Sequence, residues 1–258
     1  MKHTLPFLPE RPVKPRNSGI TMVMDKGLSI REAEDFMSVG SGYTDFVKLG
    51  FGTSLITPGY EKKIGIYKKA GVIPYFGGTL FEAFIIRNMF REFVEFLDKN
   101  EIEMVEVSDG SYDIEHTRKL EYIKDLSKRG KVISEVGSKK KEVIYTPDQW
   151  VAMMKAELDA GSIKVIAEAR ESGTTGIYNE DGSINNKIIG AISEHVRLEN
   201  VIWEAPLKSQ QAWFIKHFGA NVNLGNIAPN EIIPLESLRL GLRGDTFFQF
   251  LPGELKQK

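Results

Sequence analysis

Eight short apolar runs, each followed by a stretch with helical periodicity, constrain the fold of this chain more than any other feature. The runs are rich in β-branched and aromatic residues and are bounded by turn residues, as is typical of strands. They lie at 19–27, 43–52, 71–78, 103–110, 131–139, 164–173, 200–206 and 221–227. Such alternation favours parallel strands joined by helical crossovers.

The length of the chain favours one closed barrel. Its 258 residues match the usual size of a (β/α)₈ barrel, and no composition break or linker follows residue 19. We therefore predict an α/β fold, a single-domain (β/α)₈ TIM barrel over 19–258, preceded by a proline-rich N-terminal arm over 1–18. A doubly wound open sheet is the alternative, because alternation alone does not prove closure.

Some of the helical stretches have recognisable starts. Ser29 with Glu32, and Thr146 with Gln149, have the spacing of a capping box, and Pro147 occupies a position where a first-turn proline is tolerated. A longer stretch with helical period covers 80–100.

The composition excludes several classes of function. There are 34 basic and 35 acidic residues, so there is no nucleic-acid footprint, and no segment approaches 18 apolar residues, so we expect no membrane span or signal peptide. We expect a soluble cytoplasmic protein. The absence of cysteine excludes disulfides and thiolate chemistry.

Histidine chemistry is also disfavoured, because the four histidines fall in the arm or in helical stretches. A metal in this chain would therefore need oxygen ligands, which points to Mg²⁺ or Mn²⁺. The histidines are His3, His116, His195 and His217.

Three consecutive strands share a phrase, written VISE, VIAE and VIWE. Because side chains alternate across a strand, the isoleucine and the glutamate of each phrase share a face. The pairs are Ile133 with Glu135, Ile166 with Glu168, and Ile202 with Glu204. If the isoleucines fill the barrel interior, the glutamates lie above them at the C-terminal rim, where barrel enzymes have their active sites. Glu106 ends the fourth strand similarly.

The role of these carboxylates has two readings. Arg170, Lys48 or Lys26 could neutralise them in buried ion pairs. Several carboxylates buried together repel one another, however, and a divalent cation relieves that repulsion. We therefore expect a metal site, with Arg170 binding an anionic ligand.

Further candidates lie at other strand ends. Asp25 and Lys26 follow the first strand, and Asp109 follows the fourth. The turns at 50–54 and 76–80 combine glycines, Gly77 and Gly78 among them, with a threonine before a helix, so their N–H groups could bind an anion. Asn223 and Asn226 are expected to follow the eighth strand, where barrels often bind phosphate. The lysine run at 138–142 reads as a solvated loop on composition alone.

Longer phrases carry a family resemblance that extends from about residue 19 to 248. They are DFVKLGFGTSL, GGTLFE, VEVSDGS, SEVGSK, EARESG, EAPLKSQQ, NVNLGNI and LESLRLGLRGDTF. Together they resemble the phosphosulfolactate synthase family.

The resemblance implies a barrel enzyme, a carbon–sulfur lyase that uses Mg²⁺ to add sulfite to phosphoenolpyruvate. The product is (2R)-phospho-3-sulfolactate, which leads towards coenzyme M in archaea and to sulfolactate in some bacteria. A homo-oligomer is also implied, with a trimer as one option. The family's proposed proton donor, a lysine after the fifth strand, matches Lys139, and Ser138 stands where some relatives carry a second lysine.

The predicted site residues fall into three groups. The catalytic residues are Lys139, Lys48 and Arg170; the substrate-binding residues are Lys26, Gly77, Gly78, Asn223 and Asn226; the metal ligands are Glu135, Glu168 and Glu204, followed by Glu106 and Asp25. One alternative is an enolase-like or aldolase-like lyase, with Lys48 as the Schiff-base candidate. Another is a non-catalytic role, because heat-stress-associated proteins of plants also resemble the family.

Overall fold

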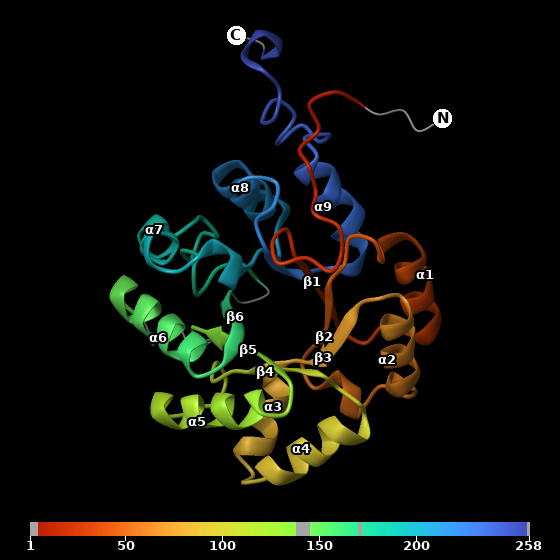
Figure 1. Cartoon of the computed structure of the whole chain (residues 1–258), viewed down its shortest axis with the longest axis vertical. Helices are drawn as coiled ribbons and strands as arrows, with labels where there is room; N and C mark the ends of the chain where they lie inside the picture. Colours follow the sequence, from red (N-terminus) through yellow and green to blue (C-terminus); the bar gives the residue numbers. More distant parts are fainter. Residues whose placement is uncertain (1–4, 138–144, 170–171, 257–258) are drawn as a thin grey trace.

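The computed structural model describes residues 5–137, 145–169 and 172–256, and in this part of the chain eight parallel strands form a nearly closed barrel (Figure 1). The strands are β1 (Thr21–Asp25), β2 (Phe46–Leu49), β3 (Ile73–Phe76), β4 (Met104–Val107), β5 (Lys131–Val136), β6 (Ser162–Ala167), β7 (Val201–Glu204) and β8 (Leu224–Ile227). Each lies within or overlaps one of the predicted apolar runs.

Strand pairing closes the sheet around most of its circumference. The hydrogen-bonded order is β3-β2-β1-β8-β7-β6-β5-β4, so the first strand pairs with the last. The two end strands of this order, β3 and β4, lie in contact with each other. Helices surround the strands on every side (Figure 1). The predicted single-domain (β/α)₈ barrel is therefore confirmed, and the open doubly wound sheet is excluded.

The helices follow the strands as predicted. They are α1 (Ile30–Gly40), α2 (Tyr60–Lys69), α3 (Gly78–Ile85), α4 (Phe90–Lys99), α5 (His116–Ser127), α6 (Pro147–Asp159), α7 (Asn186–His195), α8 (Lys208–Phe218) and α9 (Ile232–Arg239). Both predicted capping boxes are confirmed, at the starts of α1 and α6. Among the described helices, none has the length and apolar character needed to cross a membrane.

The helical stretch at 80–100 forms two helices rather than one. The chain turns between α3 and α4, where Asn88 adopts a left-handed backbone with φ of 57°. Asparagine tolerates this conformation better than most residues because its short side chain can bond locally. The connection from β3 to β4 therefore contains two helices.

Two apolar clusters stabilise the barrel. The larger lies between the strands and the surrounding helices. The smaller fills the barrel interior and consists of Ile20, Met22, Phe46, Tyr75, Met104, Ile133, Ile166 and Ile202. The prediction that the three isoleucines of the repeated phrase lie inside the barrel is confirmed.

The N-terminal arm packs against the N-terminal ends of the strands. Lys14 Nζ donates to the carbonyl of Ser41 at 2.9 Å, and Arg16 pairs with Asp45 at 2.8 Å. From inside the barrel, Lys164 Nζ donates to the carbonyl of Asn17 at 3.2 Å. The arm thus covers the end of the barrel opposite to the predicted glutamates.

At this same end, Arg239 joins α9 to the strands. Its fully buried guanidinium donates to the carbonyls of Ala220 (2.6 Å), Val222 (2.7 Å) and Ile20 (3.3 Å). Backbone carbonyls buried without a donor are costly, so one side chain satisfies groups on both sides of the β1–β8 junction.

We predict that Arg239→Met destabilises the fold by about 1–3 kcal/mol, because it removes one donor from each of three buried carbonyls, although those of Ala220 and Ile20 keep bonds from Arg11 and from the N–H of Leu224. Urea unfolding followed by circular dichroism measures this. Arg91→Met is the control: its side chain is 88% exposed in a surface pair with Glu95, and such pairs contribute only about 0–1 kcal/mol. Equal stability of the two variants would contradict the assigned role.

Candidate active site

Four glutamates lie above the apolar interior, at the C-terminal ends of β4 to β7. The strand register sets their depth: Glu106 is paired with Ile133, and Glu135 with Ile166, which is itself paired with Ile202. In this register Glu106 is offset by two residues towards the N-terminal end relative to Glu135, and Glu135 by two residues relative to Glu168. This stagger is a property of tilted barrel strands.

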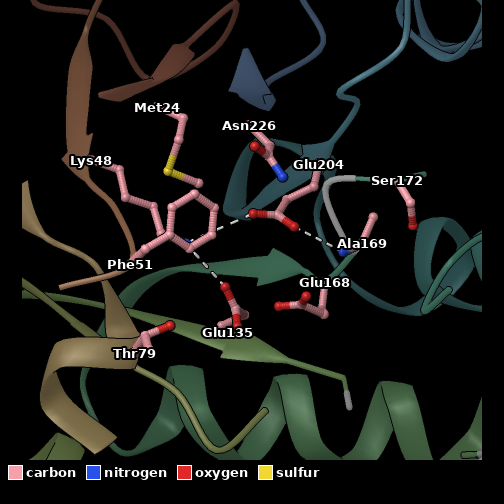
Figure 2. Close-up of a pocket in the computed structure, with 10 residues that line it drawn as sticks. All are labelled: Met24, Lys48, Phe51, Thr79, Glu135, Glu168, Ala169, Ser172, Glu204 and Asn226. Atoms are coloured by element: carbon pink, nitrogen blue, oxygen red, sulfur yellow. Dashed lines mark hydrogen bonds and ion pairs between the residues drawn. The ribbon is translucent and has the colours of Figure 1, made fainter. Parts of the chain in front are cut away.

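Three of these carboxylates converge on one point (Figure 2). Glu135, Glu168 and Glu204 each offer an oxygen, and the three oxygens lie within 4.8 Å of one another. All three residues are at most 2% exposed. The prediction that the repeated phrase brings these glutamates together at the C-terminal end of the barrel is therefore confirmed.

Lys48 on β2 is the cation of this cluster. Its buried Nζ lies 2.8 Å from Glu106 Oε1, 3.1 Å from Glu135 Oε2 and 3.8 Å from Glu204 Oε1. Lys48 shares the inner face of β2 with Phe46, which lies in the interior cluster. Among the described residues of the cluster, four carboxylates thus face one ammonium group.

Burial and mutual repulsion shift the pKa values of these groups. Burial alone would lower the pKa of Lys48, but Glu106, Glu135 and Glu204 together hold it well above its ordinary value. Burial, opposed by Lys48 and reinforced by Glu135, raises the pKa of Glu204 to about 7. Burial also raises the pKa of Glu106. Lys48 is therefore charged, and a further cation at this place would favour the charged forms of Glu106 and Glu204, whose pKa values burial raises.

The donor set fits a divalent cation that prefers oxygen ligands. Ligands on opposite sides of Mg²⁺ are about 4 Å apart, and Mg²⁺ in proteins usually takes one or two carboxylates, with substrate and water completing the shell. Glu135, Glu168 and Glu204, with oxygens within 4.8 Å, can supply such a pair after small side-chain movements. Glu106 lies outside this group, since its Oε1 is engaged by Lys48 and by the N–H of Gly78 at 2.6 Å.

Gly77 and Gly78, predicted to bind substrate, pack closely against the cluster. A Cβ on Gly77 would lie 2.9 Å from Lys48 Cε, and one on Gly78 would lie 2.2 Å from Ser108 Oγ. The N–H of Gly78, at the start of α3, donates to Glu106 rather than facing an open anion site. Here the two glycines allow α3 to approach Lys48 and Glu106, which sequence spacing alone could not indicate.

Asp25, ranked last among the predicted metal ligands, belongs to a separate network. It lies on the helix side of β1, where Oδ2 accepts from Lys63 Nζ at 2.7 Å and Tyr67 Oη at 2.8 Å. Its Oδ1 accepts the N–H groups of Gly27 and Leu28. Asp25 thus anchors α2 to β1, away from the converging glutamates. Lys26 is exposed just beyond the strand.

The two asparagines predicted to follow β8 lie at opposite ends of that strand. Asn223 precedes β8, and its amide bonds the N–H of Ile20 and the carbonyls of Glu199 and Val201, at the covered end of the barrel. Its predicted role in substrate binding is not compatible with this position. Asn226 lies within β8 in a left-handed conformation, φ 57°, and lines the cavity beside Glu204 (Figure 2).

Two predicted catalytic residues, Lys139 and Arg170, lie outside the described residues. Asp109, a weaker rim candidate, accepts from Lys119 Nζ at 2.8 Å, and Lys119 also binds Glu157 at 2.8 Å and the carbonyl of Glu135 at 2.6 Å. This buried network lies behind the site and fixes the end of β5.

A cavity of about 490 Å³ opens above the glutamates. Sequence reasoning missed several residues that line it. They are Met24, Phe51, Thr79, Ala169 and Ser172. Met24 was accessible to the alternation argument, since it is two residues beyond the interior Met22; Phe51 was not, because its position depends on the loop after β2.

We predict that Lys48→Met destabilises the metal-free protein by about 3–5 kcal/mol at pH 8, because it removes the ammonium group that contacts three buried carboxylates. A glutamate with a raised pKa binds its proton more tightly in the folded protein than in the unfolded chain. Its contribution to the free energy of unfolding is therefore greatest below the ordinary glutamate pKa and is lost as pH rises towards 7. The loss should therefore be clearly smaller at pH 5.5.

Denaturant unfolding in EDTA at both pH values measures this effect. Lys69→Met, at an exposed position on α2, is the control and should follow the wild-type pH profile. A pH-independent loss in Lys48→Met would show that the ammonium does not govern these carboxylates.

Comparisons with known proteins identify the family of this chain. Residues 9–245 match the family described as (2R)-phospho-3-sulfolactate synthase (ComA). The chain is 44% identical to a phosphosulfolactate synthase of Methanocaldococcus jannaschii (89% of this chain, 94% of that protein) and 41% identical to one of Bacillus subtilis (93% and 97%). A 3-hexulose-6-phosphate synthase structure from Salmonella typhimurium shares only the fold, with TM-score 0.57, 14% identity, and coverage of 87% of this chain and 100% of that one. The chain belongs to the phosphosulfolactate synthase family.

Proposed function

We propose that this protein adds sulfite to phosphoenolpyruvate, with Mg²⁺, to give (2R)-phospho-3-sulfolactate. The observation that carries the proposal is the convergence of three buried glutamates beside Lys48, in a cavity at the C-terminal end of the barrel. Family membership supports the product, and the oxygen-rich donor set supports the metal. The enzyme would be a carbon–sulfur lyase.

The reaction joins two anions, which sets its electrostatic requirement. The sulfur lone pair of sulfite forms a bond to C3, the π electrons of phosphoenolpyruvate move towards C2 and the carboxylate, and a proton is added at C2. Two unit charges about 4 Å apart repel by about 4 kcal/mol at an effective dielectric constant of 20. Fixed positive charge must therefore be present before the anions meet.

Glu135, Glu168 and Glu204 would hold Mg²⁺, which when bound supplies positive charge to the substrate carboxylate and to the enolate-like charge that develops on it. Lys48 lies within 3.8 Å of two of these glutamates, Glu135 and Glu204, and of Glu106, so it adds a fixed charge at the same place. Asn226 and Thr79 line the cavity and offer neutral hydrogen-bonding groups to the substrate.

The Schiff-base alternative is disfavoured by the surroundings of Lys48. A lysine that attacks a carbonyl must be neutral, which requires a lowered pKa. The adjacent glutamates instead hold the pKa of Lys48 well above its ordinary value despite its burial. An electrostatic role for Lys48 is consistent with this environment, whereas a nucleophilic role is not.

Proton delivery to C2 is assigned, by family resemblance, to Lys139, which lies outside the described residues. A lysine can act as an acid near neutral pH when neighbouring cations lower its pKa. Arg170, also outside them, remains the predicted binder of an anionic substrate group.

Purified protein should convert phosphoenolpyruvate and sulfite into phosphosulfolactate only when a divalent cation is present. Product detection by phosphorus NMR, with Mg²⁺ and with EDTA, tests the proposal. Glu168→Gln should raise the Mg²⁺ concentration needed for half-maximal activity about 10- to 100-fold, the usual range for loss of a group that supports a metal site.

Glu236→Gln is the matched control. Glu236 is also a buried glutamate, but it pairs with Arg11 at the other end of the barrel. Its Mg²⁺ requirement should remain that of the wild type. Product formation in EDTA, or no product at all with Mg²⁺, would refute the proposal.

Lys139→Ala should lose at least 100-fold in turnover, the lower range for removal of a general acid, while still binding phosphoenolpyruvate. Calorimetric titration with Mg²⁺ and phosphoenolpyruvate measures binding separately from the assay. Wild-type turnover in this variant would move the acid role to another residue.

A further inference from the structure

Phe51 is an aromatic residue held at the mouth of a polar cavity. It follows β2 and lines the cavity together with Met24 and Lys48 (Figure 2). Half of the surface of Phe51 is exposed. Ile56, in the same loop, is more exposed and is not among the residues that line the cavity. The ring is thus only partly packed and presents an apolar surface to whatever enters the site.

The loop around Phe51 is shaped to keep the ring there. Phe51 has a left-handed backbone, φ 55°, which only a few per cent of side-chain-bearing residues adopt. On one side, a Cβ on Gly50 would lie 2.3 Å from Met24 Sδ; on the other, Gly52 is also left-handed, φ 64°. Both the N–H and the hydroxyl of Thr53 donate to the carbonyl of Gly50, at 3.0 and 2.8 Å. The unfavourable conformation is therefore fixed by its neighbours.

In the proposed reaction, water competes with sulfite as the nucleophile. Any site that stabilises negative charge at C2 and the carboxylate of phosphoenolpyruvate also favours attack on C3 by water. In that reaction a C–O bond forms at C3, one proton of the water is lost, and one is added at C2, so that phosphoenolpyruvate and water give 2-phosphoglycerate. Water is the solvent and is always at high concentration, whereas sulfite is a solute that the site must bind.

The two nucleophiles differ in what they need from the protein. Water must lose a proton to a base in order to attack, whereas sulfite attacks with a lone pair that is already available. The carboxylates that line the cavity come from β5, the end of β6, and β7, while the side formed by β1 and the loop after β2 carries Met24 and Phe51. A substrate held by its carboxylate at the glutamates lies between these two sides.

We propose that Phe51, together with Met24, forms an apolar wall that keeps water from the methylene carbon of phosphoenolpyruvate and thereby selects sulfite as the nucleophile. This inference rests on the proposed function. Phe51 is then a specificity-determining residue. It contacts the substrate and excludes water from the side of the methylene carbon from which sulfite attacks, and it takes no part in proton transfer.

The test compares Phe51→Ala, Phe51→Leu and wild type in one assay with Mg²⁺, phosphoenolpyruvate and sulfite, and measures phosphosulfolactate and 2-phosphoglycerate together. Phe51→Ala should raise the ratio of 2-phosphoglycerate to phosphosulfolactate roughly 10- to 100-fold, the usual effect of changing an apolar contact in a specificity pocket. Phe51→Leu should restore most of the selectivity. Phosphoenolpyruvate affinity, measured by calorimetry, should change little.

Ile56→Ala is the matched control, because Ile56 is 81% exposed in the same loop and does not line the cavity. It should keep the wild-type product ratio. A wild-type ratio in both Phe51 variants would overturn the inference while leaving the proposed function intact. Absence of phosphosulfolactate from the wild-type reaction would refute the proposed function itself, and this inference with it.

Discussion

The contact of Lys48 with three glutamates is the interaction on which the rest of the site depends. One ammonium group lies 2.8, 3.1 and 3.8 Å from carboxylates of β4, β5 and β7. In a buried site each carboxylate requires a partner, and Lys48 serves three of them at once. The glycines at the start of α3 and the N–H of Ala169, which donates to Glu204 at 2.9 Å, support the same cluster from neighbouring loops. The cluster is thus held in place by the strands and by the loops around it.

The fold and the centre of the site could be predicted because both depend on local periodicity. Alternation along a strand places the glutamate two residues beyond the isoleucine on the same face, and Ile133, Ile166 and Ile202 do lie in the interior cluster. The helix starts at Ser29 and Thr146 also depend on residues only three positions apart. Features of this kind require no knowledge of tertiary contacts.

The remaining site features depend on contacts between distant residues. Asp25 was a plausible ligand by position, but its partner Lys63 lies on α2, the helix after β2. The N–H of Gly78 was expected to face an anion and instead meets Glu106, 28 residues further along the chain. Asn223 was placed after β8, but the strand begins one residue beyond it. The offset between the glutamates follows from the strand register. A sequence pattern specifies neither the strand boundary nor the register.

The barrel architecture by itself does not determine the chemistry of the site. The 3-hexulose-6-phosphate synthase of Salmonella typhimurium shares the architecture at 14% identity, which concerns the fold alone. Within this barrel, a layer of apolar side chains lies directly below the site. Charge begins one pleat higher, with Lys48, Glu106, Glu135 and Glu204. A barrel can therefore change its chemistry by changing this upper layer, because the apolar layer beneath it already determines where those side chains converge.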